Sequence, residues 1–227
     1  MVDRLVQGLY YITHVDNIAS ILSYGIMSHE LVEAEHIQFT PIYDEQIVHG
    51  RRQRQTPSGK SLWSFANFYF QPRNAMLYRV LIEKSVDDIV ILAIRPDILN
   101  NKDIFISTGN AASQESLILS HDDGVREISN IKKEVDKDWW SEIDGSKRKM
   151  MAEVLVPDRV QPDFVQGVYV ASYKIADALK DKIKRPELPI IPQPNMFFQP
   201  LKKICLTNNF SLVEGDMFFS KMQTLTV

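Results

Sequence analysis

Residues 146–157 read Ser-Lys-Arg-Lys-Met-Met-Ala-Glu-Val-Leu-Val-Pro. A basic run leads into a short apolar segment, 152–156, whose Val and Leu residues are typical of a buried β-strand. One carboxylate, Glu153, lies inside this strand, where burial is unfavourable unless the group has partners or faces a ligand. Two interpretations stay open: an edge-strand Glu that points to water, or a catalytic Glu at the mouth of a sheet beside a cationic loop.

The length of 227 residues fits one domain, or one domain and a fragment, and 44% hydrophobic residues suffice for a core. The only cysteine, Cys205, provides neither a disulfide framework nor a cysteine-based zinc site, and the five histidines show no metal-binding spacing. No apolar run reaches the roughly 18 residues of a membrane span, and the first residues do not show the charged and apolar regions of a signal peptide. We therefore expect a cytoplasmic protein with no metal and no membrane contact.

A positive window interrupts the otherwise balanced charge. Residues 46–82 contain no Asp or Glu. They contain the basic residues His49, Arg51, Arg52, Arg54, Lys60, Arg73 and Arg79. Such a window predicts a surface for the phosphates of a nucleotide or of a nucleic acid strand, and the alternative is a solvated loop that lacks acids.

Strand and helix patterns follow one another along the chain, and no internal repeat is visible. Strand patterns occupy 8–13, 64–70, 89–94, 104–107, 152–156 and 166–172, and helical patterns occupy 15–23, 74–80 and 173–184. Thr13 or Asp16 is the expected cap of the first helix, and Gly25 its stop. Residues 51–60 are expected to form a loop, and 113–146 a long polar excursion with some helix. Neither GxGxxG nor a P-loop occurs, so a Rossmann fold or a Walker-type nucleotide site has no support.

Four ordered blocks resemble one family. They are Leu-Tyr-Tyr-Ile-Thr-His-Val-Asp-Asn (9–17), the Arg51-Arg52 pair before a Pro/Gly loop, Asn-Phe-Tyr-Phe-Gln-Pro-Arg-Asn-Ala-Met-Leu-Tyr (67–78), and Met-Ala-Glu-Val-Leu-Val (151–156). The chain resembles, over about 5–198, the DarT family of bacterial toxins that ADP-ribosylate DNA bases.

This resemblance implies an α+β fold, the ADP-ribosyltransferase fold, with flanking helices and a central NAD cleft between two small sheets. It implies a glycosyltransferase of the pentosyltransferase class that transfers ADP-ribose from NAD to a base in single-stranded DNA. Thymidine is the first choice of base, and guanosine the second. The resemblance makes the protein the toxin of a toxin–antitoxin system.

The resemblance also assigns site residues. Glu153 and Arg52 are the expected catalytic pair, although a guanidinium is a cation at any ordinary pH and is better suited to binding the pyrophosphate or orienting the base. Arg51 is the alternative to Arg52. The expected NAD-binding residues are Tyr11, Ile12, Thr13, Ser20, Arg51, Arg52, Met76 and Tyr78. The expected DNA-binding residues are Lys147, Arg148, Lys149 and Arg73.

The expected chemistry explains the carboxylate. Cleavage of the bond between ribose and nicotinamide builds positive charge on the sugar, as in glycoside hydrolysis. A hydrogen bond from the ribose 2′-OH to Glu153 strengthens as that charge develops. Trp139 and Trp140 are candidates for stacking on unpaired bases, or for the core.

The last residues resemble a different protein. Phe-Ser-Leu-Val-Glu-Gly-Asp-Met-Phe (210–218) and Thr-Leu-Thr-Val (224–227) look like the first strands of a macrodomain such as that of the DarG antitoxin. We therefore expect a transferase domain over 1–200 and the truncated start of a macrodomain over 201–227. The implied partners are single-stranded DNA and a macrodomain antitoxin, fused in the full-length gene.

Two other functions remain open at this point. One is a non-catalytic module that binds single strands through the positive window. The other is an ADP-ribosyltransferase that acts on RNA or protein.

Overall fold

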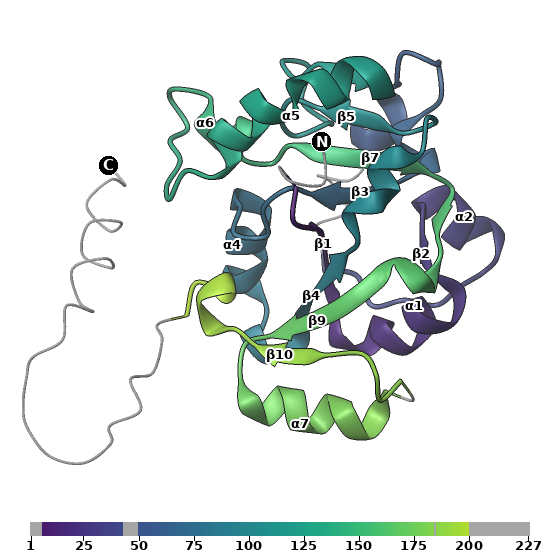
Figure 1. The fold of residues 1–227 in the computed structure, drawn as a ribbon, viewed down its shortest axis with the longest axis vertical. Helices are drawn as coiled ribbons and strands as arrows, with labels where there is room; N and C mark the ends of the chain where they lie inside the picture. The colour runs from purple at the N-terminus through teal and green to yellow at the C-terminus, as the bar shows by residue number, and fades with distance from the viewer. Residues whose placement is uncertain (1–5, 43–49, 184, 200–227) are drawn as a thin grey trace, which may run out of the picture.

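The computed structural model describes residues 6–42, 50–183 and 185–199. Its centre is an eight-stranded sheet with the order β10-β9-β4-β1-β3-β7-β5-β6 (Figure 1). The strands are β1 (Leu9–His14), β3 (Phe65–Tyr69), β4 (Ile89–Ile94), β5 (Phe105–Ser107), β6 (Ile118–Ser120), β7 (Glu153–Pro157), β9 (Val165–Val170) and β10 (Ile190–Pro192). β2 (Ile26–Met27) and β8 (Arg159–Val160) form a separate antiparallel pair.

Two halves of the large sheet meet at one point. β1 and β3 share the single residue pair Tyr10↔Tyr69, whereas β1 pairs with β4 over six residues and β3 pairs with β7 over five. The two expected small sheets are these halves, joined at Tyr10 and Tyr69. Because β1 and β3 stay paired at only one position, side chains of both strands are available to line a cleft between the halves.

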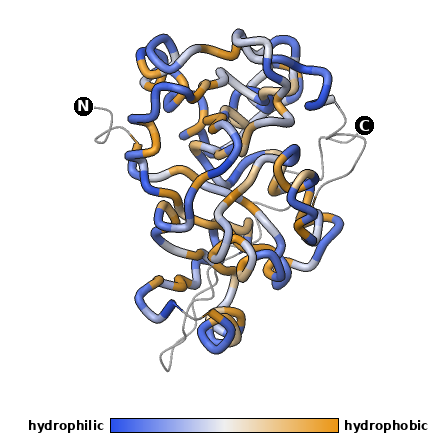
Figure 2. Tube along the Cα trace, turned by 90° about the vertical axis from the view of Figure 1, so that its right-hand side faces the viewer, coloured by the Kyte–Doolittle hydropathy of each residue, from blue (hydrophilic) through white to orange (hydrophobic). Residues whose placement is uncertain are grey.

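Helices lie around both halves, which confirms the α+β class. They are α1 (Ile18–Tyr24), α2 (His29–Ala34), α4 (Ala75–Glu83), α5 (His121–Val135), α6 (Ser146–Lys149) and α7 (Tyr173–Lys182). In Figure 1, α5 lies beside β5 at the top and α7 runs below β10. Figure 2 shows α7 nearly end-on at the bottom, with hydrophobic residues facing the sheet and hydrophilic ones outward. Ala176 and Leu179 are buried on that inner side.

Short 3₁₀ helices lie between several of these strands and helices. They are η2 (Val15–Asn17), η3 (Leu62–Ser64), η4 (Val86–Asp88), η5 (Pro96–Asn100), η6 (Pro162–Phe164) and η7 (Pro194–Phe197). Within the described residues, no helix combines the length and the apolar character that a bilayer span requires.

The first helix differs from expectation at its start. His14 is its cap, because Nδ1 of His14 accepts from the backbone N–H of Asp16 at 3.2 Å. Thr13 is occupied elsewhere, since its hydroxyl accepts from Asn17 Nδ2 at 3.0 Å. Gly25 ends the helix as expected, with a φ of 89°.

One loop expectation needs correction. Residues 51–53, expected to begin a loop, belong to a helical turn over 50–53. The excursion 113–146 contains helix as expected: the 15-residue α5, whose buried face is Gly124, Ile128, Ile131 and Val135, follows β6. These positions follow helical spacing, but polar neighbours and a glycine weaken the pattern in the sequence.

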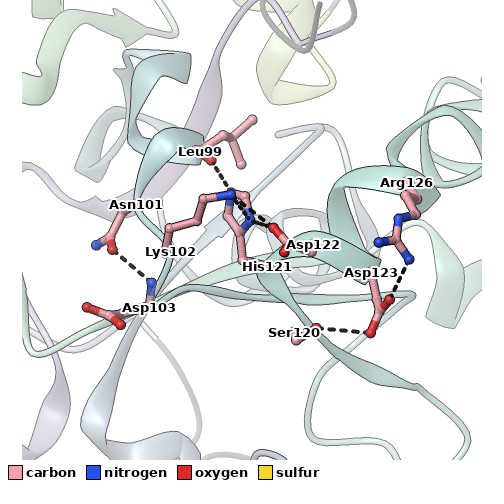
Figure 3. Close-up of polar contacts among 9 residues, drawn as sticks. All are labelled: Leu99, Asn101, Lys102, Asp103, Ser120, His121, Asp122, Asp123 and Arg126. Carbon is pink, nitrogen blue, oxygen red and sulfur yellow. Dashed lines mark hydrogen bonds and ion pairs between the residues drawn. The ribbon is translucent and has the colours of Figure 1, made fainter.

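A cluster of charged side chains at the start of α5 is structural (Figure 3). Asp122 accepts from His121 Nδ1 at 2.7 Å and from Lys102 Nζ at 3.0 Å. His121 Nε2 donates to the carbonyl of Leu99 in η5 at 2.8 Å, which ties the two segments together. The hydrogen bonds from His121 and Lys102 lower the pKa of Asp122 to about 2. A carboxylate in the first turn also suits the helix dipole.

Close packing of α5 against β5 can be tested at Gly124. An added Cβ would lie 2.6 Å from Cβ of the fully buried Ile106. We expect Gly124→Ala to lower the free energy of unfolding by about 1–3 kcal/mol, because the helix must shift away from the sheet. Gly50→Ala is the control, since no atom lies within 4 Å of its added Cβ. Urea denaturation measures both variants, and equal stabilities would contradict the packing.

Candidate active site

The main cleft lies between the two halves of the sheet and has a volume of about 580 Å³. Most of the residues expected at the NAD site line it. These are Tyr11, Ile12, Thr13, Ser20, Arg51, Met76, Tyr78 and Glu153, together with Lys147 from the basic run. Arg52, Arg73, Arg148 and Lys149 are not among the lining residues.

Glu153 is the buried charge of the cleft. It begins β7, an interior strand between β3 and β5, and only 1% of its surface is exposed. Its backbone N–H donates to Ser107 Oγ at 3.0 Å, and it is paired in register with Tyr69 of β3. These contacts exclude the interpretation of an edge-strand Glu that points to water.

Two donors hold the carboxylate of Glu153. Arg51 donates from Nη2 to Oε2 at 3.0 Å and from Nη1 to Oε1 at 3.3 Å, and the backbone N–H of Ala111 donates to Oε1 at 3.1 Å. An ionised carboxylate has about four acceptor positions, so roughly one remains, on Oε2. Glu153 is therefore oriented by the protein and can still accept one hydrogen bond from a ligand.

Arg51 is the cation that compensates the charge of this carboxylate. Its side chain is only 12% exposed, and it forms a two-pronged ion pair with Glu153. Burial alone would lower the pKa of Arg51, but the charge and hydrogen bonds of Glu153 raise it above its ordinary value. Arg51 thus stays a cation beside the carboxylate of Glu153.

Arg52 points away from Glu153. Its guanidinium pairs with Glu33 of α2 and lies 4.3 Å from the ring centroid of Trp63, and its side chain is 45% exposed. Glu33 also accepts from Trp63 Nε1 at 3.1 Å. Neighbouring residues of a helical turn point about 100° apart, so only one of two adjacent arginines can face Glu153. Arg51 therefore contacts Glu153, and Arg52 contacts Glu33.

His29 brings a neutral imidazole to the cleft. Its ring stacks on Trp63 with centroids 4.3 Å apart and planes inclined by 17°. Burial, and then the charge of Arg51, lower the pKa of His29 to about 4. No feature of the sequence around His29 indicated this position.

Other residues that line the cleft could have been predicted from the sequence. Asn17 binds the segment 37–42 to the cleft: its Nδ2 donates to the carbonyl of Thr40 at 2.8 Å, and its Oδ1 accepts from the N–H of Thr40 at 2.8 Å. Asn67 and Tyr69 line the cleft from β3. Burial, and then Glu153, raise the pKa of Tyr69 above its ordinary value. All three lie in the blocks 9–17 and 67–78, where alternation along a strand could have indicated Asn67 and Tyr69.

The basic run does not present three free cations. Lys147 pairs with Glu142, Arg148 with Glu115 at 3.2 Å, and Lys149 with Glu134 of α5 at 3.5 Å. Arg73 lies 4.9 Å from the ring centroid of Phe198. The positive window and the run are therefore partly neutralised by acids from distant parts of the sequence.

The two tryptophans separate at the mouth of the cleft. Trp140 lines the cleft and contacts Tyr78 and Phe198 edge-on, at centroid distances of 5.8 and 6.1 Å. Trp139 is 64% exposed.

No group of three or more His, Cys, Asp or Glu side chains in the described ranges could hold a metal ion.

Comparisons with known proteins match one family over most of this chain. The family model of DarT, described as ssDNA thymidine ADP-ribosyltransferase, matches residues 10–198. A Thermosipho africanus protein described as a DNA ADP-ribosyl transferase–DNA ADP-ribosyl glycohydrolase fusion is 49% identical over 220 residues, which cover 96% of this chain and 56% of that protein. The chain thus spans a little over half the length of this relative.

Solved structures confirm the expected ADP-ribosyltransferase fold. Thermosipho africanus DarTG in complex with ADP-ribose gives a TM-score of 0.86 at 46% identity, covering 94% of this chain and 57% of that one. Thermus sp. 2.9 DarT in complex with ADP-ribosylated ssDNA gives 0.74 at 18% identity, covering 84% and 96%. At the lower identity the likeness shows the fold alone.

The depressed pKa of His29 makes stability depend on pH. Between pH 6.5 and pH 4 the unfolded chain binds a proton at this residue and the folded chain does not. The free energy of unfolding should therefore fall as the pH drops through this window, by up to about 3 kcal/mol from this residue. His29→Gln should flatten the dependence, measured by denaturation at several pH values. His36→Asn, at an exposed histidine, is the control, and an unchanged slope in His29→Gln would contradict the assignment.

Proposed function

Because the chain belongs to the DarT family of ssDNA thymidine ADP-ribosyltransferases, we propose that it transfers ADP-ribose from NAD to a base in single-stranded DNA and acts as a toxin. Thymidine is the proposed base, in agreement with the family description. One observation carries the proposal: a buried carboxylate, held by Arg51 and Ala111, keeps one acceptor position open toward a cleft large enough for a dinucleotide.

NAD is the proposed occupant of the main cleft. Tyr11, Ile12 and Thr13 of β1 would face the nicotinamide end, and Ser20, Met76 and Tyr78 would contact the rest of the ligand. The remaining acceptor position of Glu153 would take the 2′-OH of the nicotinamide ribose. As the bond to nicotinamide breaks, the ribose becomes cationic, and the hydrogen bond to a fixed carboxylate strengthens.

Arg51 and Arg52 have different proposed roles. Arg51 would orient the carboxylate of Glu153 and, at the cleft wall, would also attract the pyrophosphate. Arg52 would support Arg51 from outside the cleft, through its contacts with Glu33 and Trp63. Neither side chain is suited to accept a proton from the target base, because a guanidinium has donors and no acceptor.

The wider context of the activity is also a proposal. The Thermosipho africanus relative is described as a fusion of a transferase with a glycohydrolase. A macrodomain antitoxin, encoded in the same chain or beside it, is the proposed partner, and 201–227 would be its first part. These residues lie outside the described ranges. The cytoplasm is the proposed location, since NAD and DNA are both available there.

Two alternatives are separated from the proposal by one assay. A non-catalytic module would bind an oligonucleotide without changing its mass, and a transferase for RNA or protein would leave DNA unmodified. The proposal predicts that incubation with NAD adds one ADP-ribose to single-stranded DNA, read by mass spectrometry. The buried Glu153 favours the enzyme over a binding module, because a strand-binding surface has no use for a buried anion.

Glu153→Gln should lower the rate of transfer at least about 100-fold, because the lost interaction is strongest in the transition state. Affinity for NAD, measured by calorimetry, should change much less. Transfer at a near-normal rate in this variant would remove Glu153 from the mechanism.

Arg51→Gln and Arg52→Gln form a matched pair. We expect Arg51→Gln to reduce transfer at least about 100-fold, because it leaves a buried carboxylate without its cation. Arg52→Gln should reduce transfer less than about 10-fold, since the lost ion pair is exposed. The reverse order of effects would restore Arg52 as the essential arginine.

Deletion of 201–227 tests the proposed boundary. Thermal melting and transfer activity should stay close to those of the full chain, if these residues belong to a second domain. A large fall in melting temperature would make them part of the transferase.

A further inference from the structure

Arg54 follows the helical turn that carries Arg51. Its backbone N–H donates to the carbonyl of Gly50 at 3.3 Å, and its carbonyl accepts from the N–H of Leu62 at 2.9 Å, so its backbone is fixed on both sides. Residues three apart lie on the same side of a helical turn. Arg54 therefore faces the same way as Arg51, while Arg52 between them faces outward to its own partners.

The guanidinium of Arg54 reaches the loop 108–117, which connects β5 to β6. Nη2 donates to the carbonyl of the buried Ser116 at 3.0 Å, and Nη1 donates to the side chain of Gln114. Nε of Arg54 is buried and has no hydrogen-bond partner among the described residues, a cost that the contacts of the two Nη atoms have to offset. Arg54 does not line the main cleft, so it acts on the protein and not on a ligand there.

The same loop carries a backbone donor to Glu153. Its two ends are joined, since the N–H of Thr108 donates to the carbonyl of Leu117 at 3.0 Å and the N–H of Leu117 donates to Thr108 Oγ1 at 3.1 Å. From within this closed loop the buried Ala111 donates its N–H to Glu153 Oε1 at 3.1 Å. A movement of the loop would therefore change the hydrogen bond that the carboxylate receives from it.

We propose that Arg54 is a positioning residue, which fixes the loop 108–117 against the turn that carries Arg51. The N–H of Ala111 and the guanidinium of Arg51 then hold the carboxylate of Glu153 in one orientation. The consequence for catalysis rests on the proposed function, because a carboxylate that is already oriented stabilises the cationic ribose without reorganisation. With a loose loop, Glu153 would adopt several orientations, and only a fraction of the molecules would be ready to react.

Hydrogen exchange at Ala111 tests the positioning without an activity assay. Exchange of the backbone N–H groups of the full chain is followed by NMR in the wild type and in Arg54→Met. We expect the N–H of Ala111 to exchange at least about 10-fold faster in the variant, because the loop opens more often. The N–H groups of β4 should exchange at unchanged rates, which shows that the variant is folded. If Arg54→Met does not fold, Arg54→Lys, which keeps the cation and one donor, should still give an exchange rate above that of the wild type.

Kinetics test the consequence for the reaction. Arg54→Met should lower kcat for ADP-ribose transfer about 10-fold and change KM for NAD less than about 2-fold, because Arg54 does not line the cleft. In the Glu153→Gln background the same substitution should change the residual rate less than about 2-fold, because the carboxylate that it positions is gone.

Arg126→Met is the matched control. It also removes one guanidinium, but Arg126 is 75% exposed and pairs with Asp123 within α5 at 3.0 Å. Because an exposed ion pair of this kind contributes little, we expect both kcat and the exchange rate of Ala111 to change less than about 1.5-fold.

The outcomes separate this inference from the proposed function. If the N–H of Ala111 exchanges at the wild-type rate in Arg54→Met, other contacts hold the loop and the inference is wrong. If Arg54→Met lowers the transfer rate equally with and without the carboxylate of Glu153, Arg54 acts independently of Glu153 and the inference is also wrong. If the wild type transfers no ADP-ribose while Ala111 exchanges faster in the variant, the proposed function fails and the positioning of Glu153 by Arg54 stands.

Discussion

The ion pair between Arg51 and Glu153 is the interaction on which the rest of the structure depends. A carboxylate with 1% exposure at the start of an interior strand would be strongly destabilising without a cation. Removing one partner of such a pair typically costs about 3–5 kcal/mol, because the other charge stays buried. The chain therefore has to bring Arg51 to β7 from a segment about one hundred residues earlier in the sequence.

Several segments cooperate to keep that pair in place. Ser61 Oγ donates to the carbonyl of Arg52 at 2.9 Å, which fixes the helical turn at 50–53. Glu33 and Trp63 hold the side chain of Arg52 on the outside of that turn. From the other side, Ser107 Oγ accepts from the backbone N–H of Glu153, and the backbone N–H of Ala111 donates to the Glu153 carboxylate. The cleft is thus built from parts of both halves of the sheet, which are themselves joined at one residue pair.

Much of this arrangement follows from local patterns in the sequence. Strands such as 89–94 are continuous runs of Ile, Val, Leu and Ala, and Glu153 is conspicuous as a charge within such a run. The blocks 9–17 and 67–78 contain most of the cleft lining. Local patterns do not show which side chain of a helical turn faces the interior and which faces outward. Arg51 and Arg52 are chemically identical neighbours, and only the contact with Glu33 and Trp63 decides which one turns outward.

Ion pairs between separate elements could not be predicted from the sequence either. Lys147, Arg148 and Lys149 read as one cationic patch, yet Glu115 and Glu134 neutralise two of them from other elements. The bounds of helix α5 within 113–146 were not predicted for a different reason: its buried face includes Gly124, which a hydrophobic pattern does not count. Both failures concern contacts between elements, which a single sequence does not encode locally.

A crystal structure of this chain with a non-hydrolysable NAD analogue would test the central claim most directly. The account predicts that the analogue lies in the main cleft, with the 2′-OH of the nicotinamide ribose within hydrogen-bond distance of Glu153 Oε2 and with Arg51 at the cleft wall. An analogue bound away from Glu153, or contacted by Arg52 in place of Arg51, would contradict it.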